Sequence, residues 1–480
     1  MLNFQDIAKI TVEAIHEKKE EERSHSRNSG SGEELPKTIT EKRKEKIKEH
    51  IDDFIENSSL HGLSYIFDKR HSVRRIIWFV ITVAAFGYSM QKVYESTVNF
   101  LDYPFNTARM RQYVDEIEFP AVSFCNLNDM RMSVLNGTMV DEAILDHSKA
   151  KNVTAEVYRN VTRGAAHLLE EMLVDCTFNG MKCSHENFTF FYWKQGDQCF
   201  TFNSGQKGHP VLSVTGTGIE RSLTMTINLQ HYDYYRDRLI SGIHLLLHGQ
   251  DETPVRIRGP MISPGYTTYI QVEKKQIINL ESPYKTHCGS LNLKYFKSYS
   301  RNTCWLEQLT DYVNESCGCK DFFMPGEIPI CSFQVAISCM WPKWEEFDTE
   351  KLYNCPLPCE IHTYYGHSKS RALFPSKNQA PKLADLVRND THMKDVKGID
   401  DLQFLRDNFL RIVIFYDDLS YEKLEQQPSY DMLVWLGDIG GQIGLFIGAG
   451  VMSYFEFVDC LLLVIFARFA QSFKTKPIVV

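Results

Sequence analysis

The C-terminal segment from Ser429 to Phe469 constrains the fold of this chain more than any other stretch. It has no basic residue between Met432 and Ala467 and is rich in large apolar side chains. A helix that rises about 1.5 Å per residue crosses a bilayer in roughly 20 residues, and this stretch is longer. We therefore predict a membrane-spanning helix that contains an additional structural feature.

The polar residues of this segment lie on one side of the predicted helix. At about 100° per residue they fall within an arc of about 120°. They are Asp438, Gln442, Ser453, Glu456 and Asp459. Carboxylates in a membrane are costly unless they face protein or water, so Asp438, Glu456 and Asp459 predict the charged lining of a cation path. The alternative for Glu456 and Asp459 is that they only bond to neighbouring helices.

Glycines recur in the same segment. Gly440, Gly444 and Gly448 are spaced to let helices pack closely, and simple packing is one explanation for them. Gly448-Ala449-Gly450 lies in the middle of the span, which suits a helix that stops and restarts. Unwound backbone at membrane depth is tolerated only where it lines water or protein, and there its carbonyls can ring an ion.

A second uncharged stretch, from Ile76 to Gln91, is long enough for one crossing if it extends to about Tyr94. It lies too far along the chain for a cleaved signal peptide. Basic residues precede this helix and follow the second one, which places both termini inside by the positive-inside rule. They are Lys69, Arg70, Arg74 and Arg75 before the first helix, and Arg468, Lys474 and Lys476 after the second.

These observations predict a multi-pass protein of the plasma membrane with cytoplasmic termini. Residues 1–73 are expected to be cytoplasmic, 74–95 the first transmembrane helix, 96–430 extracellular, 431–468 the pore-lining second helix and 469–480 a cytoplasmic tail. The charged N-terminal residues, up to about Glu56, predict two short solvated helices with a flexible joint near Ser29 to Gly32.

Twelve of the thirteen cysteines lie in the predicted extracellular region, and Cys460 alone lies in the membrane. Cys317-Gly-Cys319 and Cys355-Pro-Leu-Pro-Cys359 lack zinc-ligand spacing, and an oxidising exterior favours disulfides over a metal site. N-glycosylation acceptor patterns in the same region agree with an exterior position. They begin at Asn136, Asn152, Asn160, Asn187, Asn314 and Asn389.

The extracellular residues predict a mixed α+β domain. Alternating apolar and polar residues predict a strand from Phe119 to Cys125, an antiparallel region from Phe188 to Val272, and a strand from Phe409 to Asp417 that returns to the membrane. Helical patterns cover Asn152 to Leu173, Thr303 to Asn314, Pro381 to Arg388 and Asp400 to Asn408. The predicted fold is two transmembrane helices with a large disulfide-rich α+β ectodomain.

Two classes of function are excluded by these patterns. A formal net charge of −8 leaves no basic patch for nucleic-acid binding. No nucleophile elbow, phosphate-binding loop or His-Glu-x-x-His motif occurs in the sequence. We therefore expect neither an enzyme nor a bound cofactor.

Three motifs together resemble the epithelial sodium channel/degenerin superfamily, most closely its acid-sensing and cnidarian-type peptide-gated branches. They are Ser59-Leu60-His61-Gly62, then Phe119-Pro120-Ala121-Val122 with Cys125-Asn126, and Leu436-Gly437-Asp438-Ile439-Gly440-Gly441-Gln442-Ile443-Gly444-Leu445-Phe446-Ile447-Gly448-Ala449. The resemblance implies a trimer in which each subunit contributes two helices, the second lining the pore. It also implies a hand-like ectodomain with palm, β-ball, finger, thumb and knuckle.

The resemblance assigns roles to matching positions. It implies that Gly448-Ala449-Gly450 is the selectivity filter, with Glu456 and Asp459 as acidic positions below it. Gly450 departs from the serine that usually ends this tract, which leaves the preference for sodium over potassium or calcium open. His61-Gly62, which could also be a simple turn, matches a re-entrant gating motif. Gly437 matches the position where bulky side chains hold such channels open. Gly444 matches the position that binds amiloride.

The cysteine spacing fits the family's disulfide framework with one pair absent. The implied bridges are Cys125 to Cys199, Cys176 to Cys183, Cys288 to Cys359, Cys304 to Cys355, Cys317 to Cys339 and Cys319 to Cys331. Gln308 and Tyr353 occupy the positions of the missing pair, so no orphan thiol is left.

Other matches concern gating. Tyr103 matches an aromatic at the top of the first helix that stacks on a loop aromatic, here Tyr284, and Leu419-Ser420 matches a hinge that turns during desensitisation.

The family's proton-sensing positions fall on Tyr235, Arg236, Trp341 and Glu345 in a pocket, on Arg111 and Asp417 in the lower palm, and on Pro104 and Phe105 in place of a histidine pair. A single acid and a predicted salt bridge between Arg111 and Asp417 make poor proton switches, which favours a peptide ligand with acid as a modulator at most.

We therefore expect a subunit of a trimeric, sodium-preferring, amiloride-sensitive cation channel that is opened by an extracellular ligand such as a neuropeptide or modulated mechanically. The expected partners are related subunits in a homo- or heterotrimer, membrane lipid, sodium ions and the extracellular ligand, peptide or proton. The alternatives are a proton-gated acid-sensing channel, or a non-conducting two-pass receptor or auxiliary subunit that requires related subunits.

Overall fold

The structure is a computed structural model, which describes residues 39–192, 198–206, 208–236, 240–250, 252–254, 259–351 and 353–469. The chain divides into two compact units, Met1–Val98 with Met432–Val480, and Asn99–Asp431. The first unit contains the apolar segments and the second contains the cysteine-rich region. The joint predicted near Ser29 lies outside the described residues.

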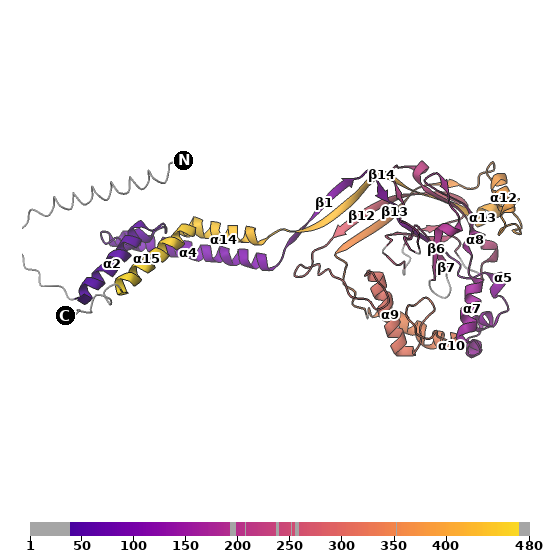
Figure 1. The fold of residues 1–480 in the computed structure, drawn as a ribbon, viewed down its shortest axis with the longest axis horizontal. Coiled ribbons are helices and arrows are strands. Elements are labelled where there is room, and N and C mark those ends of the chain that lie inside the picture. The colour runs from indigo at the N-terminus through magenta and orange to yellow at the C-terminus, as the bar shows by residue number, and fades with distance from the viewer. Residues whose placement is uncertain are drawn as a thin grey trace, which may run out of the picture. The chain divides into compact units, whose positions relative to one another are not determined.

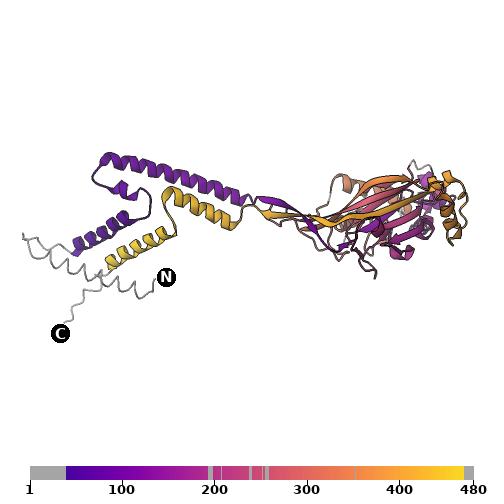
Figure 2. The ribbon, with the colours of Figure 1, turned by 90° about the horizontal axis from the view of Figure 1, so that it is seen from above.

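The first unit is helical through most of its described part (Figure 2). Its helices are α2 (Ile39–Asn57), α3 (Leu63–Phe67), α4 (Ser72–Leu101), α14 (Met432–Ile447) and α15 (Val451–Phe469). Helix α4 runs past the predicted end at residue 95, and an ion pair of 2.7 Å between Lys92 and Glu95, three residues apart, supports its last turns.

Among the described helices, α4 is long and apolar enough by itself to cross a membrane. Helices α14 and α15 meet this criterion only when they are taken together as one broken span, because they are bent by 66° at the break between them. The glycine-rich segment therefore stops and restarts, as its sequence predicts, and does not form one continuous helix.

Helices α4 and α14 lie side by side and antiparallel (Figure 2). The rings of Tyr88 and Phe446 meet edge to face with centroids 5.0 Å apart, and Trp435 Nε1 donates to Thr97 Oγ1 at 3.3 Å. At the other end of the unit, α2 lies along α15, where the rings of Phe54 and Phe457 are 6.3 Å apart. Aromatic contacts thus hold the helix pairs of this unit.

In the part of the second unit that the structure describes, the strands form three sheets (Figure 1). The largest has seven strands in the order β13-β12-β14-β9-β4-β5, with β1 also paired to β14; the second has the order β11-β10-β3-β7-β6, and β2 pairs with β8. The strands are β1 (Phe105–Tyr113), β2 (Ile117–Glu118), β3 (Ala121–Asn126), β4 (Leu173–Phe178), β5 (Met181–Lys182), β6 (Phe188–Tyr192), β7 (Gln198–Phe202), β8 (Ser213–Val214), β9 (Leu223–Asn228), β10 (Ile243–His248), β11 (Met261–Ile262), β12 (Tyr266–Ile278), β13 (Glu360–Leu373) and β14 (Phe409–Pro428).

The antiparallel region predicted from Phe188 to Val272 includes one parallel pairing, at β12. This strand pairs antiparallel with β13 but parallel with β14, from Thr267 opposite Arg411 to Ile278 opposite Glu425. Strand β14 is also longer than its predicted range of Phe409 to Asp417, because its polar second half pairs with β1 along its whole length. Alternation cannot reveal such pairing between segments far apart in the chain.

The helices of the second unit lie around the sheets (Figure 1). They are α5 (Met132–Leu135), α6 (Met139–Leu145), η2 (His147–Asn152), α7 (Ala155–Ala165), α8 (Leu169–Met172), η3 (His185–Asn187), η5 (Ile219–Arg221), η6 (His231–Asp233), α9 (Arg301–Cys317), α10 (Phe333–Val335), η7 (Ala336–Met340), α11 (Trp341–Thr349), α12 (Ala380–Asn389) and α13 (Leu402–Asn408). Of these, α9 and α11 pack on each other in a core of their own. The single helix predicted from Asn152 to Leu173 is broken between α7 and α8. There the buried His167 ring bonds to Gln230 at 2.8 Å and to Asn128 at 3.1 Å.

Six disulfides join the cysteines of the second unit within the described residues. The pairs are Cys125–Cys199, Cys176–Cys183, Cys288–Cys359, Cys304–Cys355, Cys317–Cys339 and Cys319–Cys331, the same pairs that the family resemblance implies. Gln308, at a position of the missing pair, donates to the carbonyl of Asn354 at 3.2 Å and accepts from its amide at 2.9 Å. Two hydrogen bonds therefore tie α9 to the segment beside Tyr353.

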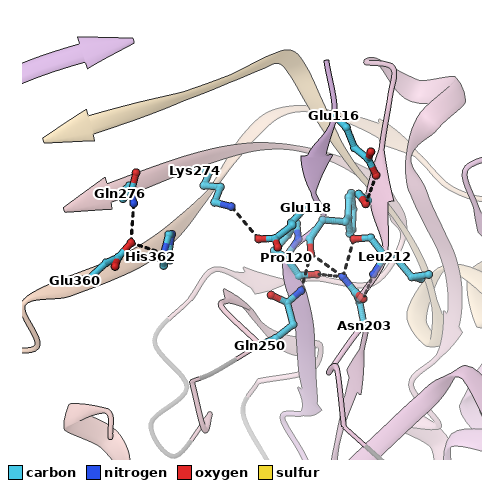
Figure 3. A network of polar contacts seen from close by, with 12 residues as sticks. Glu116, Glu118, Pro120, Asn203, Leu212, Gln250, Lys274, Gln276, Glu360 and His362 are labelled. Atoms are coloured by element: carbon cyan, nitrogen blue, oxygen red, sulfur yellow. Dashed lines mark hydrogen bonds and ion pairs between the residues drawn. The ribbon is translucent and has the colours of Figure 1, made fainter. Parts of the chain in front are cut away.

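Polar contacts hold the segment between β2 and β3 to residues just after β7 and β10, and an ion pair joins β2 to β12 (Figure 3). Asn203 Nδ2 and Gln250 Nε2 both donate to the carbonyl of Phe119, at 2.6 Å and 2.8 Å. Lys274 on β12, with only 10% of its side chain exposed, pairs with Glu118 at 3.1 Å. Because buried polar groups are costly unless they are paired, these bonds fix the short segment that enters β3.

Candidate functional site

The break between α14 and α15 is built from glycine geometry and one serine. Gly448 has a φ of +77°, a left-handed conformation that residues other than glycine adopt at a cost. Its amide still donates to Gly444 O at 3.0 Å, so the first helix ends there. Ser453 Oγ accepts from the amide of Gly450 at 3.0 Å and caps the turn that starts α15.

The segment before α3 packs directly on this break. The amide of His61 donates to Ile447 O at 2.8 Å. A Cβ atom added to Gly448 would lie 2.7 Å from the His61 ring and 2.8 Å from Ser59 O. Gly62 also has a positive φ, +85°, and an added Cβ there would lie 2.5 Å from Thr82 Oγ1. The structure therefore brings the predicted gating motif and the predicted filter tract into contact within the first unit.

Glu456 is bonded to the same segment. Its Oε2 accepts from the Ser59 amide at 3.0 Å and from Ser59 Oγ at 3.1 Å, and Ser59 Oγ lies 2.5 Å from Ser453 Oγ. This role of Ser59 and Ser453 was not predicted from the sequence, although Ser453 is among the polar residues on one side of the predicted helix. Asp459, one turn further along α15, is exposed in the single subunit.

Two other predicted positions on α14 have open surroundings in the described residues of one chain. A Cβ added to Gly437 would meet nothing within 4 Å, and one added to Gly444 would meet only Ala449 O at 4.0 Å. Packing within the subunit therefore does not require glycine at these positions. Asp438 lies half-buried on the same helix.

The second unit contains a cavity of about 290 Å³ between the segment near α6 and α7 and the helices near α10 and α11. Tyr235, Arg236 and Trp341, three of the four pocket positions taken from the family, line it; Glu345 does not. Its other lining residues are Asp129, Met130, Val140, Ile144, His147, Tyr158, Thr162 and Phe333. The wall is mostly apolar and aromatic, with a few polar groups, as in typical ligand sites.

Asp141 does not line this cavity but is bonded to two side chains that do. It was not among the predicted residues. It accepts from Tyr235 Oη at 2.7 Å, from Arg236 Nη2 at 3.0 Å and from the Gly137 amide at 3.0 Å. Burial alone would raise the pKa of Asp141, but the hydrogen bonds from Tyr235, Gly137 and Arg236, together with the Arg236 charge, lower it below its ordinary value. Asp141 therefore anchors the two pocket side chains, and their hydrogen bonds hold its pKa below the ordinary value.

Asp321 is a second buried acid, on the segment between α9 and α10. Its Oδ1 accepts from the Phe322 amide at 2.7 Å, whereas its Oδ2 and the hydroxyl of the nearby Tyr158 are buried without a partner in the described residues. Burial raises the pKa of Asp321 to about 7 from the usual 3.8. Folding therefore favours the protonated form of Asp321. The stability that this form contributes is lost as the pH rises from 3.8 to about 7.

The residues between α4 and β1 lie close to a loop after β12. The rings of Tyr103 and Tyr284 meet edge to face with centroids 5.6 Å apart, and Lys285 pairs with Asp102 at 2.9 Å. The structure thus places the two predicted aromatics in contact.

The predicted salt bridge between Arg111 and Asp417 is wrong. Arg111 pairs with Asp418 at 2.9 Å and also donates to Ser420 Oγ at 3.0 Å, whereas Asp417 lies 3.7 Å from Lys369. Successive residues of a strand point to opposite faces, so a shift of one position along β14 exchanges the partner. Leu419 and Ser420, the predicted hinge, lie inside β14, and the Leu419 carbonyl accepts from the Val114 amide at 3.0 Å.

The acceptor asparagines of the glycosylation patterns lie on the second unit. Asn136, Asn152, Asn160, Asn187 and Asn389 are exposed and Asn314 is half-buried, so the structure leaves the first five accessible.

These features define a membrane protein with a disulfide-rich α/β ectodomain and an apolar segment broken at glycines. Residues 54–460 match the protein family described as amiloride-sensitive sodium channel. The chain therefore belongs to the amiloride-sensitive sodium channel family, which is a family of ion channels. The resemblance seen in its motifs is confirmed.

Named relatives agree with this assignment. Acid-sensing ion channel 1C of Danio rerio is 31% identical over 85% of this chain and 82% of its own length. Acid-sensing ion channel 1 of Gallus gallus is 29% identical, over 89% and 86%. Acid-sensing ion channel 2 of Homo sapiens is 28% identical, over 85% of both chains. A solved proton-activated chloride channel is 6% identical with a TM-score of 0.32 over 81% of this chain and 98% of its own, too low to support any inference.

Proposed function

We propose that this chain is a subunit of a trimeric, sodium-preferring, amiloride-sensitive cation channel of the plasma membrane. The observation that carries the proposal is the break at Gly448-Ala449-Gly450, an unwound stretch inside an apolar segment with Glu456 and Asp459 beyond it. Backbone carbonyls freed from a helix and rings of acids are the usual means of attracting and selecting cations. Membership of the amiloride-sensitive sodium channel family supports the same function.

We also propose a membrane topology for the chain. Helix α4 would be the first span and the broken pair α14 and α15 the second, with both termini cytoplasmic and the second unit outside. The filter would be Gly448-Ala449-Gly450, amiloride would bind near Gly444, and bulky residues at Gly437 would hold the pore open. His61-Gly62 would support the filter from below as a re-entrant segment.

We propose that the activating ligand is an extracellular peptide and that it binds in the 290 Å³ cavity. Apolar and aromatic walls suit peptide side chains, and the exposed Arg236 offers a charge to a carboxylate. The only predicted acid of the pocket, Glu345, does not line it, and Asp141 is held ionised. Neither of these two acids therefore favours proton uptake in the cavity as the main trigger.

Protons remain the second candidate ligand, and one observation favours a role for them. Asp321 is buried next to Phe322 and near Tyr158, a lining residue of the cavity, and this burial raises its pKa to about 7. Acidification stabilises this packing, so we propose that acid modulates the response to a peptide. The relatives named above are acid-sensing channels by name, which supports testing both ligands together.

Expression of the chain alone, with its surface amount measured, tests the function. Candidate peptides at neutral pH are expected to evoke an inward sodium current that amiloride blocks, and a step to mildly acidic pH without peptide is expected to evoke none. Large transient currents on the acid step would identify a proton-gated channel. Current that appears only with related subunits would identify an obligate heteromer, and its absence in every combination would identify a non-conducting receptor.

Asp321→Asn is expected to remove the dependence of peptide-evoked current on pH between about 8 and about 6, because asparagine cannot ionise there. Three polar side chains lie around Asp321. Tyr158 faces it from α7, the Arg163 guanidinium lies over the neighbouring Phe322 ring, and the Lys320 ammonium is bonded to backbone carbonyls. Glu327→Gln, an exposed acid on the same segment, is the control and should leave the pH dependence unchanged. An unaltered pH profile in Asp321→Asn would assign acid modulation to other groups.

Tyr103→Ala is expected to reduce peptide-evoked current roughly tenfold while peptide binding persists, because the edge-to-face contact with Tyr284 joins the residues between α4 and β1 to the loop after β12. Tyr284→Ala should have the same effect, and the double variant should add little to either single one. Tyr113→Ala, which alters a tyrosine 72% exposed at the end of β1, is the control. Normal gating in Tyr103→Ala would show that the contact is ordinary packing.

A further inference from the structure

Three side chains hold the short helix α3 against the start of α4. The Tyr65 ring stacks on the Trp78 ring, with centroids 4.5 Å apart and an angle of 24° between the planes. The Arg74 guanidinium lies over the same Tyr65 ring, 4.5 Å from its centroid. Aromatic rings attract one another when stacked, and a cation is attracted to the face of a ring, so both contacts hold Tyr65 in place. We call Tyr65, Trp78 and Arg74 the aromatic clamp.

The clamp belongs to one face of α4. Arg74, Trp78 and Thr82 are spaced four residues apart, so they are neighbours along the surface of the helix. Gly62 lies against the same face, because a Cβ atom added to it would lie 2.5 Å from Thr82 Oγ1 and 3.5 Å from Trp78 Cε3. The face of α4 therefore receives both Gly62 and Tyr65, three residues apart on the segment that contains α3.

Helix α3 is too short to be stable by itself. It has five residues, none of them buried, and isolated helices shorter than about 12 residues are marginal in water. Its N-cap residue, Gly62, provides no side-chain hydrogen bond. Arg75 Nε donates to the carbonyl of Ile66 at 2.9 Å, which adds a contact from α4 beside the clamp. The position of α3 therefore depends on its contacts with α4.

The residues just before α3 reach the break between α14 and α15. The His61 amide donates to Ile447 O at 2.8 Å, and the Ser59 amide donates to Glu456 Oε2 at 3.0 Å. Only three residues separate His61 from Tyr65 along the chain. Movement of Tyr65 away from α4 would therefore disturb the hydrogen bonds at the break.

We propose that the aromatic clamp positions the segment from Ser59 to His61 against the break, which makes Tyr65, Trp78 and Arg74 positioning residues for ion selection. This inference rests on the filter proposed above for Gly448-Ala449-Gly450. The three side chains act through the segment from Ser59 to His61 and not by contact with the ion.

The test measures how often this segment lies against α15 in the purified full chain in detergent. Ser59→Cys and Ser453→Cys are introduced together with Cys460→Ser, which removes the free cysteine. The two serine Oγ atoms lie 2.5 Å apart, close to the length of about 2.0 Å of a disulfide bond, so oxidation with diamide is expected to join the cysteines. Tyr65→Ala and Trp78→Ala in this background are each expected to slow the loss of the two thiols about threefold to tenfold, as for the loss of one stacked aromatic pair.

Two variants in the same background are the controls. Tyr65→Phe keeps the aromatic ring and should form the disulfide at the unaltered rate. Phe67→Ala removes a ring that is 50% exposed on the same helix and should also leave the rate unaltered. An unaltered rate in Tyr65→Ala, or no disulfide when the clamp is intact, would overturn the proposal.

Ion selectivity separates this inference from the proposed function. In the chain without added cysteines, Tyr65→Ala is expected to lower the ratio of sodium to potassium permeability roughly twofold or more, and Tyr65→Phe should preserve it. Slower disulfide formation with an unaltered permeability ratio would support the clamp and refute the proposed role of this segment at the filter. Because disulfide formation is measured without current, it decides the clamp even if the chain does not conduct.

Discussion

Gly448→Ala is expected to reduce peptide-evoked current roughly tenfold or more, while the protein still reaches the cell surface. The left-handed conformation at Gly448, φ +77°, costs a residue with a side chain about 1–2 kcal/mol. The added methyl group would also overlap the His61 ring at 2.7 Å and Ser59 O at 2.8 Å. Relief of both contacts requires the segment from Ser59 to His61 to move away from the break.

Gly450→Ala is the control for this prediction. Gly450 lies two residues further along the same turn, its φ is not positive, and an added Cβ meets nothing within 4 Å in the described residues. This variant should conduct, and Gly450→Ser, which restores the residue usual in the family, should conduct with a sharper preference for sodium. Equal currents from Gly448→Ala and Gly450→Ala at equal surface amounts would contradict the structural account of the break.

Sequence reasoning predicted those features that local patterns determine. The run of apolar residues with embedded glycines predicted an interrupted span, and α14 and α15 are separated at the predicted tract. The exterior region predicted a disulfide-linked mixed domain, and the cysteine pairs follow the framework that the resemblance implied. Periodicity and residue chemistry are both local properties, so they can be read before any contact is known.

Long-range contacts were the part that the sequence did not reveal. The hydrogen bonds of Ser59 with Glu456 join residues 397 positions apart, and the partner of Arg111 is Asp418, displaced by one position along a strand. Asp141 and Asp321 resemble ordinary surface acids in the sequence, since burial depends on what packs over them. Each case depends on register or on tertiary packing, which a single sequence leaves undetermined.

Glu456 has two possible roles that these contacts now separate. Its carboxylate accepts two hydrogen bonds from Ser59 and so holds the His61 segment against the break, and it also carries a negative charge near the proposed filter. A structural partner needs an oxygen acceptor, whereas a pore charge needs ionisation. Glutamine keeps the oxygen and removes the charge, so one substitution distinguishes the two roles.

Glu456→Gln is expected to lower single-channel conductance roughly twofold or more, because three copies of the charge in a trimer would concentrate cations at the inner end of the filter. Asp459→Asn, which alters an exposed acid one turn away, should lower conductance in the same direction. Ser59→Ala, which removes the hydroxyl bond but retains the backbone amide, is expected to change gating and to leave conductance unchanged. If Glu456→Gln and Asp459→Asn both conduct with unaltered permeability ratios while Ser59→Ala disturbs the channel, Glu456 acts only as the partner that holds the re-entrant segment.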